Sequence, residues 1–133
     1  MKTDIEILNE IKMLILSQNQ IIILDDTQIP YCALVNYFDL LIPEQLDICA
    51  KILPMIALEF VPHLLTSERL DWCIKQSPSL ALVFASDLLN PEQLDWCAEQ
   101  QPYYALQFAY NLLNLERLHW CAMQYLKIKQ IVN

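Results

Sequence analysis

The sequence predicts an all-α fold built from repeated helical hairpins, and three observations support this prediction. The chain repeats itself every 24 residues over segments 22–45, 46–69, 70–93 and 94–117, and a shortened copy follows at 118–133. A proline recurs at the ninth position of every full copy, and every full copy ends in a helix-start pattern. A fixed period of this length is typical of a solenoid, in which each unit buries its apolar face against its neighbours.

The junction between copies predicts where each first helix begins. A helix-capping side chain stands there in three copies, as Thr66, Asn90 and Asn114. Pro43 and Pro91 occupy the first helical position, which proline favours because its missing N–H would have no partner there. A glutamate then lies in the first turn, where it meets the positive end of the helix dipole. We assign this structural role to Glu44, Glu68, Glu92 and Glu116.

The recurring proline is expected to end the first helix and to open a second one, because proline disfavours the α conformation in the residue before it. The second helix is predicted to run through segments such as PYYALQFAYNLL. Its apolar residues, at positions 12, 13, 15, 16, 19 and 20 of each copy, form a wide stripe that we expect to be buried. The prolines are Pro30, Pro54, Pro78 and Pro102.

We predict one helical-repeat domain over residues 1–133. Residues 3–16 form an amphipathic helix with a capping box at Thr3 and Glu6, so 1–21 is expected to cap the first repeat. The predicted fold is an all-α, right-handed αα-solenoid of about four to five helical-hairpin repeats, although no residue fixes its hand. The final copy loses its proline in YLKIKQIVN. Its apolar residues would either seal the stack or pair two chains as a homodimer.

Pro91, Leu94, Ala98, Pro102 and Ala105 stand where units of the leucine-rich repeat variant family have similar residues. The pattern over 22–121 resembles that family, whose units have the same length, and other short αα-solenoid families fit nearly as well. In the family the second segment tends towards a 3₁₀ helix, whereas the length of PxxALxF favours an α-helix here. The family's iron–sulfur member carries a cysteine cluster in a separate segment. This chain has no similar cluster, so the resemblance implies no cofactor.

Composition narrows the class of function. The net charge is −8 and the chain contains no glycine, which excludes glycine-rich phosphate loops. An acidic balance disfavours nucleic acid and anionic membranes and favours a partner with a basic surface. Apolar runs are shorter than the roughly 20 residues that a membrane span needs. Asp4, Glu6 and Glu10 interrupt the stretch where a signal peptide would be apolar, so we expect a cytoplasmic protein.

The cysteines recur at a spacing that predicts buried thiols. Equivalent residues of stacked helices lie roughly 8–10 Å apart, beyond the roughly 7 Å Cα separation that a disulfide tolerates. His63 and His119 lie in different copies and have no partner arrangement for catalysis. We therefore predict no enzyme activity, no metal and no cofactor. Cys49, Cys73, Cys97 and Cys121 occupy the fourth position, and Cys32 lies outside that register.

The second and third positions of the copies form a candidate binding strip. This Asp–Trp strip consists of Asp47, Asp71, Asp95, Trp72, Trp96 and Trp120. Each indole is expected either to pack against the adjacent repeat or to be partly exposed as an anchor for a partner. The carboxylates show no evident pairing in the sequence. They are expected to form either a solvated face or a docking strip for Arg and Lys side chains of a partner.

A second candidate surface comes from positions 10, 11, 14, 17 and 18, which vary between copies and are therefore expected to face outward. Tyr103, Tyr104 and Tyr110 are its most distinctive members. The predicted function is protein–protein interaction, as a small acidic inhibitor, immunity protein or adaptor. Two alternatives remain: a self-assembling structural module, and an acidic nucleic-acid mimic that blocks a nucleic-acid-binding protein such as a nuclease.

Overall fold

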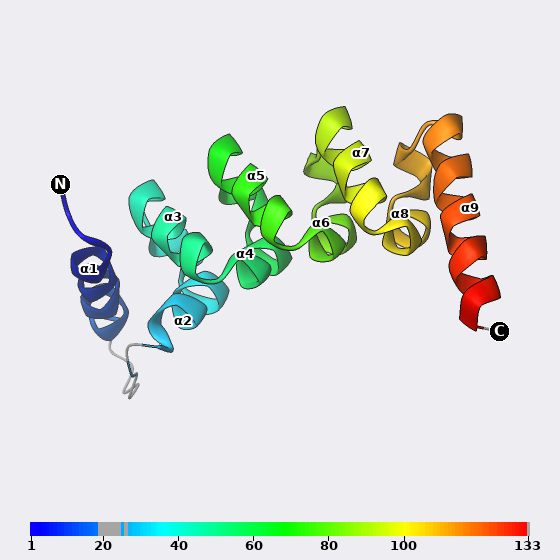
Figure 1. Ribbon diagram of the computed structural model, residues 1–133. Coiled ribbons are helices and arrows are strands. Elements are labelled where there is room, and N and C mark those ends of the chain that lie inside the picture. Colours follow the sequence, from blue (N-terminus) through cyan, green and yellow to red (C-terminus); the bar gives the residue numbers. More distant parts are fainter. Residues whose placement is uncertain (19–24, 26, 133) are drawn as a thin grey trace. The chain divides into compact units, whose positions relative to one another are not determined.

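All regular structure is helical in the residues that the computed structural model describes, which are 1–18, 25 and 27–132 (Figure 1). The predicted all-α class is therefore confirmed. The chain divides into two compact units, Met1–Cys73 and Ile74–Asn133, and the boundary falls within helix α5. None of the described helices is long and apolar enough to cross a membrane. Residues 19–21 of the predicted cap and residues 22–24 and 26 of the predicted first copy lie outside the described residues.

Helix α1 (Asp4–Leu16) opens the first unit as predicted. The Thr3 side chain caps it by accepting a hydrogen bond from the Glu6 N–H at 3.2 Å. The helix packs against α2 (Ile29–Asn36) and α3, and its buried side chains are Ile7, Ile11 and Ile15. The isoleucines recur every fourth residue, so they share one face of the helix.

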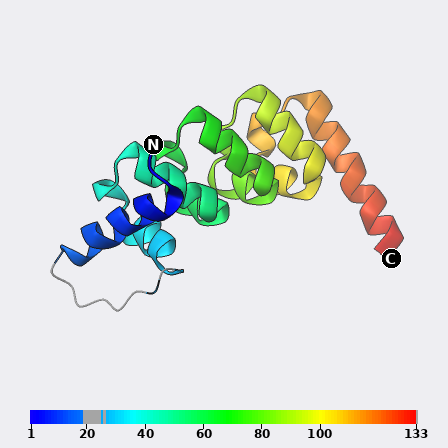
Figure 2. The same ribbon diagram turned by 60° about the vertical axis from the view of Figure 1, so that its left-hand side comes forward.

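The same succession of elements then recurs three times: a helix of 10 residues, a helix of 7 and a 3₁₀ segment of 3. A similar 3₁₀ segment, η1 (Phe38–Leu40), follows α2. The three sets are α3 (Pro43–Ile52), α4 (Pro54–Phe60) and η2 (Pro62–Leu64); α5 (Ser67–Gln76), α6 (Pro78–Phe84) and η3 (Ser86–Leu88); and α7 (Pro91–Gln100), α8 (Pro102–Phe108) and η4 (Tyr110–Leu112). In the second unit α8 lies beside α7 and α9 (Figures 1 and 2).

The predicted helix starts are confirmed. The side chains of Thr66, Asn90 and Asn114 accept hydrogen bonds from the backbone N–H three residues later, at 3.2, 2.8 and 2.7 Å. The recurring proline is the first residue of α4, α6 and α8, with one residue between it and the end of the preceding helix, whereas α2 begins at Ile29, one residue before Pro30. Where it is missing, in the last copy, α9 (Leu115–Val132) runs on as one helix.

The second helix is shorter than predicted, because it gives way to the 3₁₀ segment after its seventh residue. This turn buries position 16 completely, as Val61, Ala85 and Ala109. It also turns positions 15 and 19 outward, so the prediction that they belong to the buried stripe is wrong. Phe60, Phe84 and Phe108 are 41, 41 and 40 % exposed, and the leucines of position 19 are Leu40, Leu64, Leu88 and Leu112 at 39–44 %.

The predicted burial of the thiols is confirmed. All five cysteines are free and buried. The Cys73 thiol lies 3.9 Å from the Ala50 carbonyl oxygen, and Cys121 makes the same contact with Ala98 at 4.0 Å. Loss of solvent on burial raises the pKa of Cys49 to about 12 and that of Cys73 to about 11, so neither is a reactive thiolate near neutral pH.

Candidate protein-binding surfaces

The first aspartate of the Asp–Trp strip is paired with an arginine of the same chain. Arg69 on α5 donates from Nε to Asp47 Oδ1 at 2.9 Å and from Nη2 to Asp47 Oδ2 at 3.0 Å. This two-pronged geometry is the strong form of a guanidinium–carboxylate contact. The hydrogen bond to Asp47 also raises the pKa of Arg69. The carboxylate of Asp47 is therefore balanced within the protein, contrary to the unpaired arrangement that the sequence suggested.

Arg117 on α9 makes the corresponding contact in the second unit with looser geometry. Its Nε lies 3.4 Å from Asp95 Oδ1, and its Nη2 lies 2.9 Å from Glu99 Oε1. The side chains of Asp95 and Glu99 are 48 and 49 % exposed, so water screens both contacts. Asp71, the remaining aspartate of the strip, is partly buried and is not without a partner either.

Each tryptophan of the strip carries a cation of the same chain on its ring. The guanidinium carbon of Arg69 lies 5.0 Å from the Trp72 ring centre, and that of Arg117 lies 5.1 Å from Trp120. Lys75 Nζ lies 3.9 Å from the Trp96 ring centre. All three indoles are partly buried. They therefore contribute cation–π contacts to the fold, each typically worth about 0.5–1 kcal/mol at an exposed site.

The glutamine or arginine that ends each copy determines which contact forms. Gln45 and Gln93 fold back, and each accepts a hydrogen bond at 3.0 Å from the N–H before its own helix, on Ile42 and Asn90. The longer arginine reaches instead the aspartate on the first helix of the preceding hairpin, which is α3 for Arg69 and α7 for Arg117. The roles of Arg69 and Arg117 were not predicted from the sequence. The alternation of Gln and Arg at one position, with an Asp 22 residues earlier, was the available signal.

Two shallow hollows, one in each unit, are each lined by a set of five side chains. The aspartate, arginine and tryptophan of each set form what we call an Asp–Arg–Trp clamp. Each hollow has a volume of about 270 Å³. The two sets occupy the same repeat positions, two periods apart. The glutamate in each is exposed and has no ion pair or hydrogen bond in the described part of the chain. The sets are Asp47, Thr66, Glu68, Arg69 and Trp72, and Asp95, Asn114, Glu116, Arg117 and Trp120.

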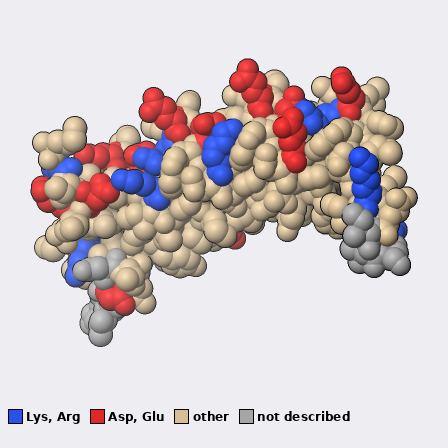
Figure 3. Space-filling view, in the orientation of Figure 1, with Lys and Arg blue, Asp and Glu red and all other residues tan. Residues whose placement is uncertain are grey.

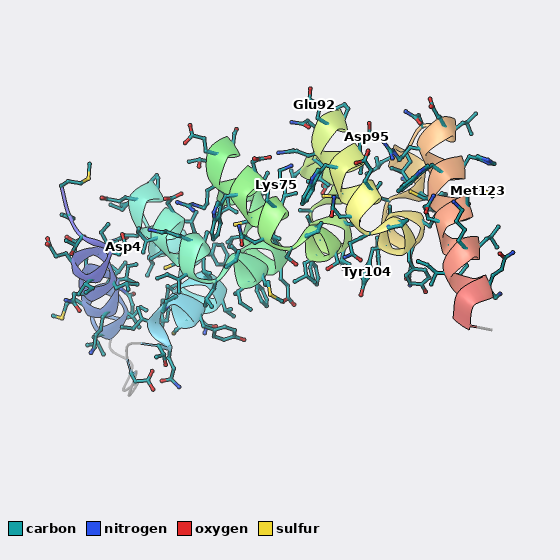
Figure 4. The ribbon with its side chains drawn as sticks, viewed as in Figure 1. Asp4, Lys75, Glu92, Asp95, Tyr104 and Met123 are labelled. Carbon is teal, nitrogen blue, oxygen red and sulfur yellow. The ribbon has the colours of Figure 1, made fainter. Side chains whose placement is uncertain are left out.

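The predicted tyrosines lie in a stretch of the second unit that carries no charge between Glu99 and Glu116. Tyr103 and Tyr104 on α8 are 49 and 37 % exposed, and Tyr110 at the start of η4 is 61 % exposed. Tyr104 lies away from Glu92, which is at the beginning of α7 (Figure 4). In the space-filling view acidic side chains of this unit lie over α7 and the start of α9, and basic side chains also lie further along α9 (Figure 3).

The structure brings two of these tyrosines together with rings that the sequence did not single out. Tyr103 meets Tyr104 edge to face at 6.1 Å and stacks on Tyr125 of α9 at 5.4 Å. Tyr104 stacks on Phe108 at 6.0 Å. Tyr125 was missed because it lies in the last copy, where the repeat pattern is lost and no register predicts a neighbour. We call Tyr103, Tyr104, Phe108 and Tyr110 the aromatic surface.

Variation between copies did not mark exposure everywhere. Cys32 at position 11 and Pro62 at position 17 are buried, so the expectation that all variable positions face outward is wrong. At position 10, by contrast, Tyr31, Met55 and Tyr103 are about half exposed. Variation at one position therefore reflects local packing as well as surface.

The described residues contain no group of three His, Cys, Asp or Glu side chains that could hold a metal ion. His63 and His119 are exposed. Comparison of this chain with protein-family models, with curated proteins and with solved structures found no match. The resemblance to leucine-rich repeat variants therefore stays a prediction, and function has to be argued from the surfaces.

Proposed function

We propose that this chain is a protein–protein interaction module that binds its partner through the aromatic surface. The observation that carries this proposal is the exposure of four aromatic rings within one uncharged stretch. Aromatic side chains dominate the energetic centres of interfaces, and charged residues are depleted there because they must lose their hydration. Tyr110 is the most exposed of the four rings, at 61 %. It lies in a 3₁₀ segment held between two helices.

The scaffold that we propose for this module is a right-handed αα-solenoid of four to five 24-residue hairpins, with α1 as its cap. The recurrence of a first helix, a second helix and a 3₁₀ segment supports this arrangement. A preformed scaffold loses little conformational freedom on binding, which favours affinity. The free, buried cysteines fit a reducing compartment, so we place the module in the cytoplasm. It uses no cofactor in this role.

The partner is proposed to be a protein with basic side chains around the contact. The net charge of −8 attracts such a protein over distance. Glu68, Glu92 and Glu116 are exposed and have no ion pair in the described part of the chain. Charges at an interface rim act mainly on the rate of association and on the choice of partner. A small acidic module of this kind is suited to act as an inhibitor, an immunity protein or an adaptor.

Self-assembly is a second candidate, and one observation favours it. Met123, Leu126 and Ile128 on α9 are 42, 48 and 54 % exposed, and such apolar exposure suits a homodimer contact through the last repeat. Mimicry of nucleic acid has weaker support. Arg69 and Arg117 neutralise Asp47 and Asp95, which lowers the density of negative charge along the Asp–Trp strip.

Capture experiments test the proposed surface. Wild type, Tyr104→Ser/Tyr110→Ser and the control Tyr31→Ser are immobilised at equal folded fraction and exposed to lysate from the source cells. We expect one protein that is retained by the wild type and the control and lost from the double variant. Tyr31 is a suitable control because it is 49 % exposed on α2 of the other unit. Equal retention by all three would reject the aromatic surface.

The mass of the purified chain as a function of concentration separates the two candidates. A mass that rises with concentration, and stops rising in Leu126→Glu/Ile128→Glu, would support self-assembly. A monomer at all concentrations would leave the interaction module as the function.

A further inference from the structure

A groove between α8 and α9 in the second unit extends the aromatic surface. It has a volume of about 360 Å³ and is lined by Tyr103, Leu106, Gln107 and Tyr125. The stacked rings of Tyr103 and Tyr125, tilted by 30°, join the two helices at this place. These two side chains are still 49 and 37 % exposed. Aromatic material from two helices therefore lies at the groove and remains accessible.

The groove offers hydrogen-bond donors without offering charge. The phenol groups of Tyr103 and Tyr125 and the side-chain amide of Gln107 can each donate a hydrogen bond to a carbonyl oxygen of a ligand. The lining includes no Asp, Glu, Lys, Arg or His side chain. A charged segment would lose its hydration here and find no opposite charge in return. The matching occupant is an uncharged segment that brings carbonyl oxygens and apolar rings.

We propose that this groove binds a proline-rich segment of the partner in the polyproline II conformation. That conformation has no internal hydrogen bonds, so its carbonyl oxygens are available to phenol and amide donors. Its pyrrolidine rings pack against aromatic side chains, and its stiffness keeps the entropy cost of binding low. The inference rests on the proposed function and names the chemistry of the partner.

Two other occupants fit the groove less well. An amphipathic helix needs an uninterrupted apolar groove, and the phenol oxygens and Gln107 interrupt this one. A second copy of the chain cannot supply the segment, because no two of its seven prolines are adjacent or three residues apart. It would also bring a net charge of −8 against another −8.

Terminally blocked decaproline is the probe for the test, and a glycine–serine peptide of equal length is its control. Binding to the full chain is followed by calorimetry and by the shifts of backbone amide resonances. We expect saturable binding of decaproline alone, with the largest shifts around Gln107. Tyr103→Ala and Tyr125→Ala should each weaken it roughly tenfold or more, as loss of a hot-spot ring does.

The matched control is Tyr31→Ala, because Tyr31 holds the same repeat position as Tyr103 and is equally exposed at 49 %. It should bind decaproline as the wild type does. Tyr103→Phe keeps the ring and loses only the hydroxyl, so it should fold normally and weaken binding a few-fold, by about one neutral hydrogen bond. This variant keeps the test valid if Tyr103→Ala does not fold.

Three results would overturn the proposal: no saturable binding of decaproline, equal binding of the glycine–serine peptide, or unchanged binding by both Tyr103→Phe and Tyr125→Ala. A concentration-dependent mass that Tyr103→Ala abolishes would also overturn it and would assign the groove to a second copy. If decaproline fails while capture of a protein still depends on Tyr104 and Tyr110, the interaction module stands and only the proline-rich ligand is wrong.

Discussion

Two copies of the repeat, those that contain Trp72 and Trp96, each have a cation over the tryptophan ring, but the cation comes from a different residue in each. At Trp72 the cation is Arg69, which lies one turn earlier on the same helix and also holds Asp47 of α3 with two hydrogen bonds. In the copy that contains Trp96, the position of Arg69 is occupied by Gln93. Its side chain instead accepts a hydrogen bond from the N–H of Asn90, just before its own helix. Lys75, from the last turn of α5, takes the place over the Trp96 ring.

The comparison shows that both indoles have a cation over the ring, although the cation is an arginine of the same helix at Trp72 and a lysine of another helix at Trp96. The arginine route joins a carboxylate, a guanidinium and an indole from two helices, whereas the lysine route joins an ammonium and an indole alone. The Asp–Trp strip is therefore engaged in holding neighbouring hairpins, and fewer of its charges remain for a partner. In the described part of the chain the rings of the aromatic surface have no ion pair or cation–π contact of this kind, and this difference is the reason that we propose the binding role for them.

The largest effect on the free energy of unfolding is expected at the leucine that begins each copy of the repeat. Leu94→Ala should lower the free energy of unfolding by roughly 2–5 kcal/mol, because Leu94 is buried and the truncation leaves a cavity. Leu118→Ala should cost less, because Leu118 has the same position in the last copy but is only partly buried. Urea unfolding of both variants measures the difference. A loss below about 1 kcal/mol for Leu94→Ala would contradict the burial of this stripe.

The Asp–Arg–Trp clamp of the first unit should contribute more to the free energy of unfolding than that of the second unit. Asp47→Ala leaves the guanidinium of Arg69, which is 19 % exposed, without its carboxylate, and should cost about 1–3 kcal/mol. Asp95→Ala should cost only about 0.5 kcal/mol, because Asp95 is 48 % exposed and Arg117 keeps Glu99. Equal losses of unfolding free energy for Asp47→Ala and Asp95→Ala in urea would contradict the expectation that the closer, less exposed contact of Arg69 with Asp47 contributes more stability.

The burial of the thiols predicts a loss of stability at alkaline pH. Burial raises the pKa of Cys49 from 9.0 to about 12, so the unfolded chain loses this proton first as pH rises. The contribution is complete below pH 9 and declines between pH 9 and pH 12. At pH 10 the loss from Cys49 should be about 1 kcal/mol. Cys49→Ala should have a flatter dependence of unfolding free energy on pH in this range; an unchanged slope would contradict the assignment to Cys49.

The smallest effect is expected at Glu99, which supports Arg117 from an exposed position. Glu99→Gln should change the free energy of unfolding by about 0.5 kcal/mol or less, and the change should shrink as salt is added. Thermal unfolding at low and high ionic strength measures it. An effect as large as that of Asp47→Ala would mean that Arg117 depends on Glu99 more than the exposure of this pair implies.

Much of the fold could be predicted because its signals are local. Thr66, Asn90 and Asn114 cap helices through hydrogen bonds that span three residues, and the recurring proline ends a helix through its own geometry. The exposure of Phe84 and Phe108 could not be predicted in this way. It depends on where the second helix turns into a 3₁₀ segment, and apolar periodicity does not mark that turn.

The candidate site was only partly predictable for the same reason. Tyr103, Tyr104 and Tyr110 stood out as variable aromatic residues, and the structure places them on an exposed, uncharged stretch. The contact of Arg69 with Asp47 and that of Tyr103 with Tyr125 each join residues on different helices. Such contacts depend on how the hairpins pack, and a repeat register alone does not provide that.

The decisive measurement is the affinity of the captured partner for two matched double variants at equal folded fraction. Tyr104→Ser/Tyr110→Ser removes rings from the aromatic surface, and Glu68→Gln/Glu116→Gln removes unpaired charges beside the two clamps without touching their aspartates. We expect the tyrosine variant to bind roughly tenfold more weakly or worse, and the glutamate variant to change mainly its association rate. Loss of binding in the glutamate variant, with full binding in the tyrosine variant, would contradict this and place the site on the acidic edge.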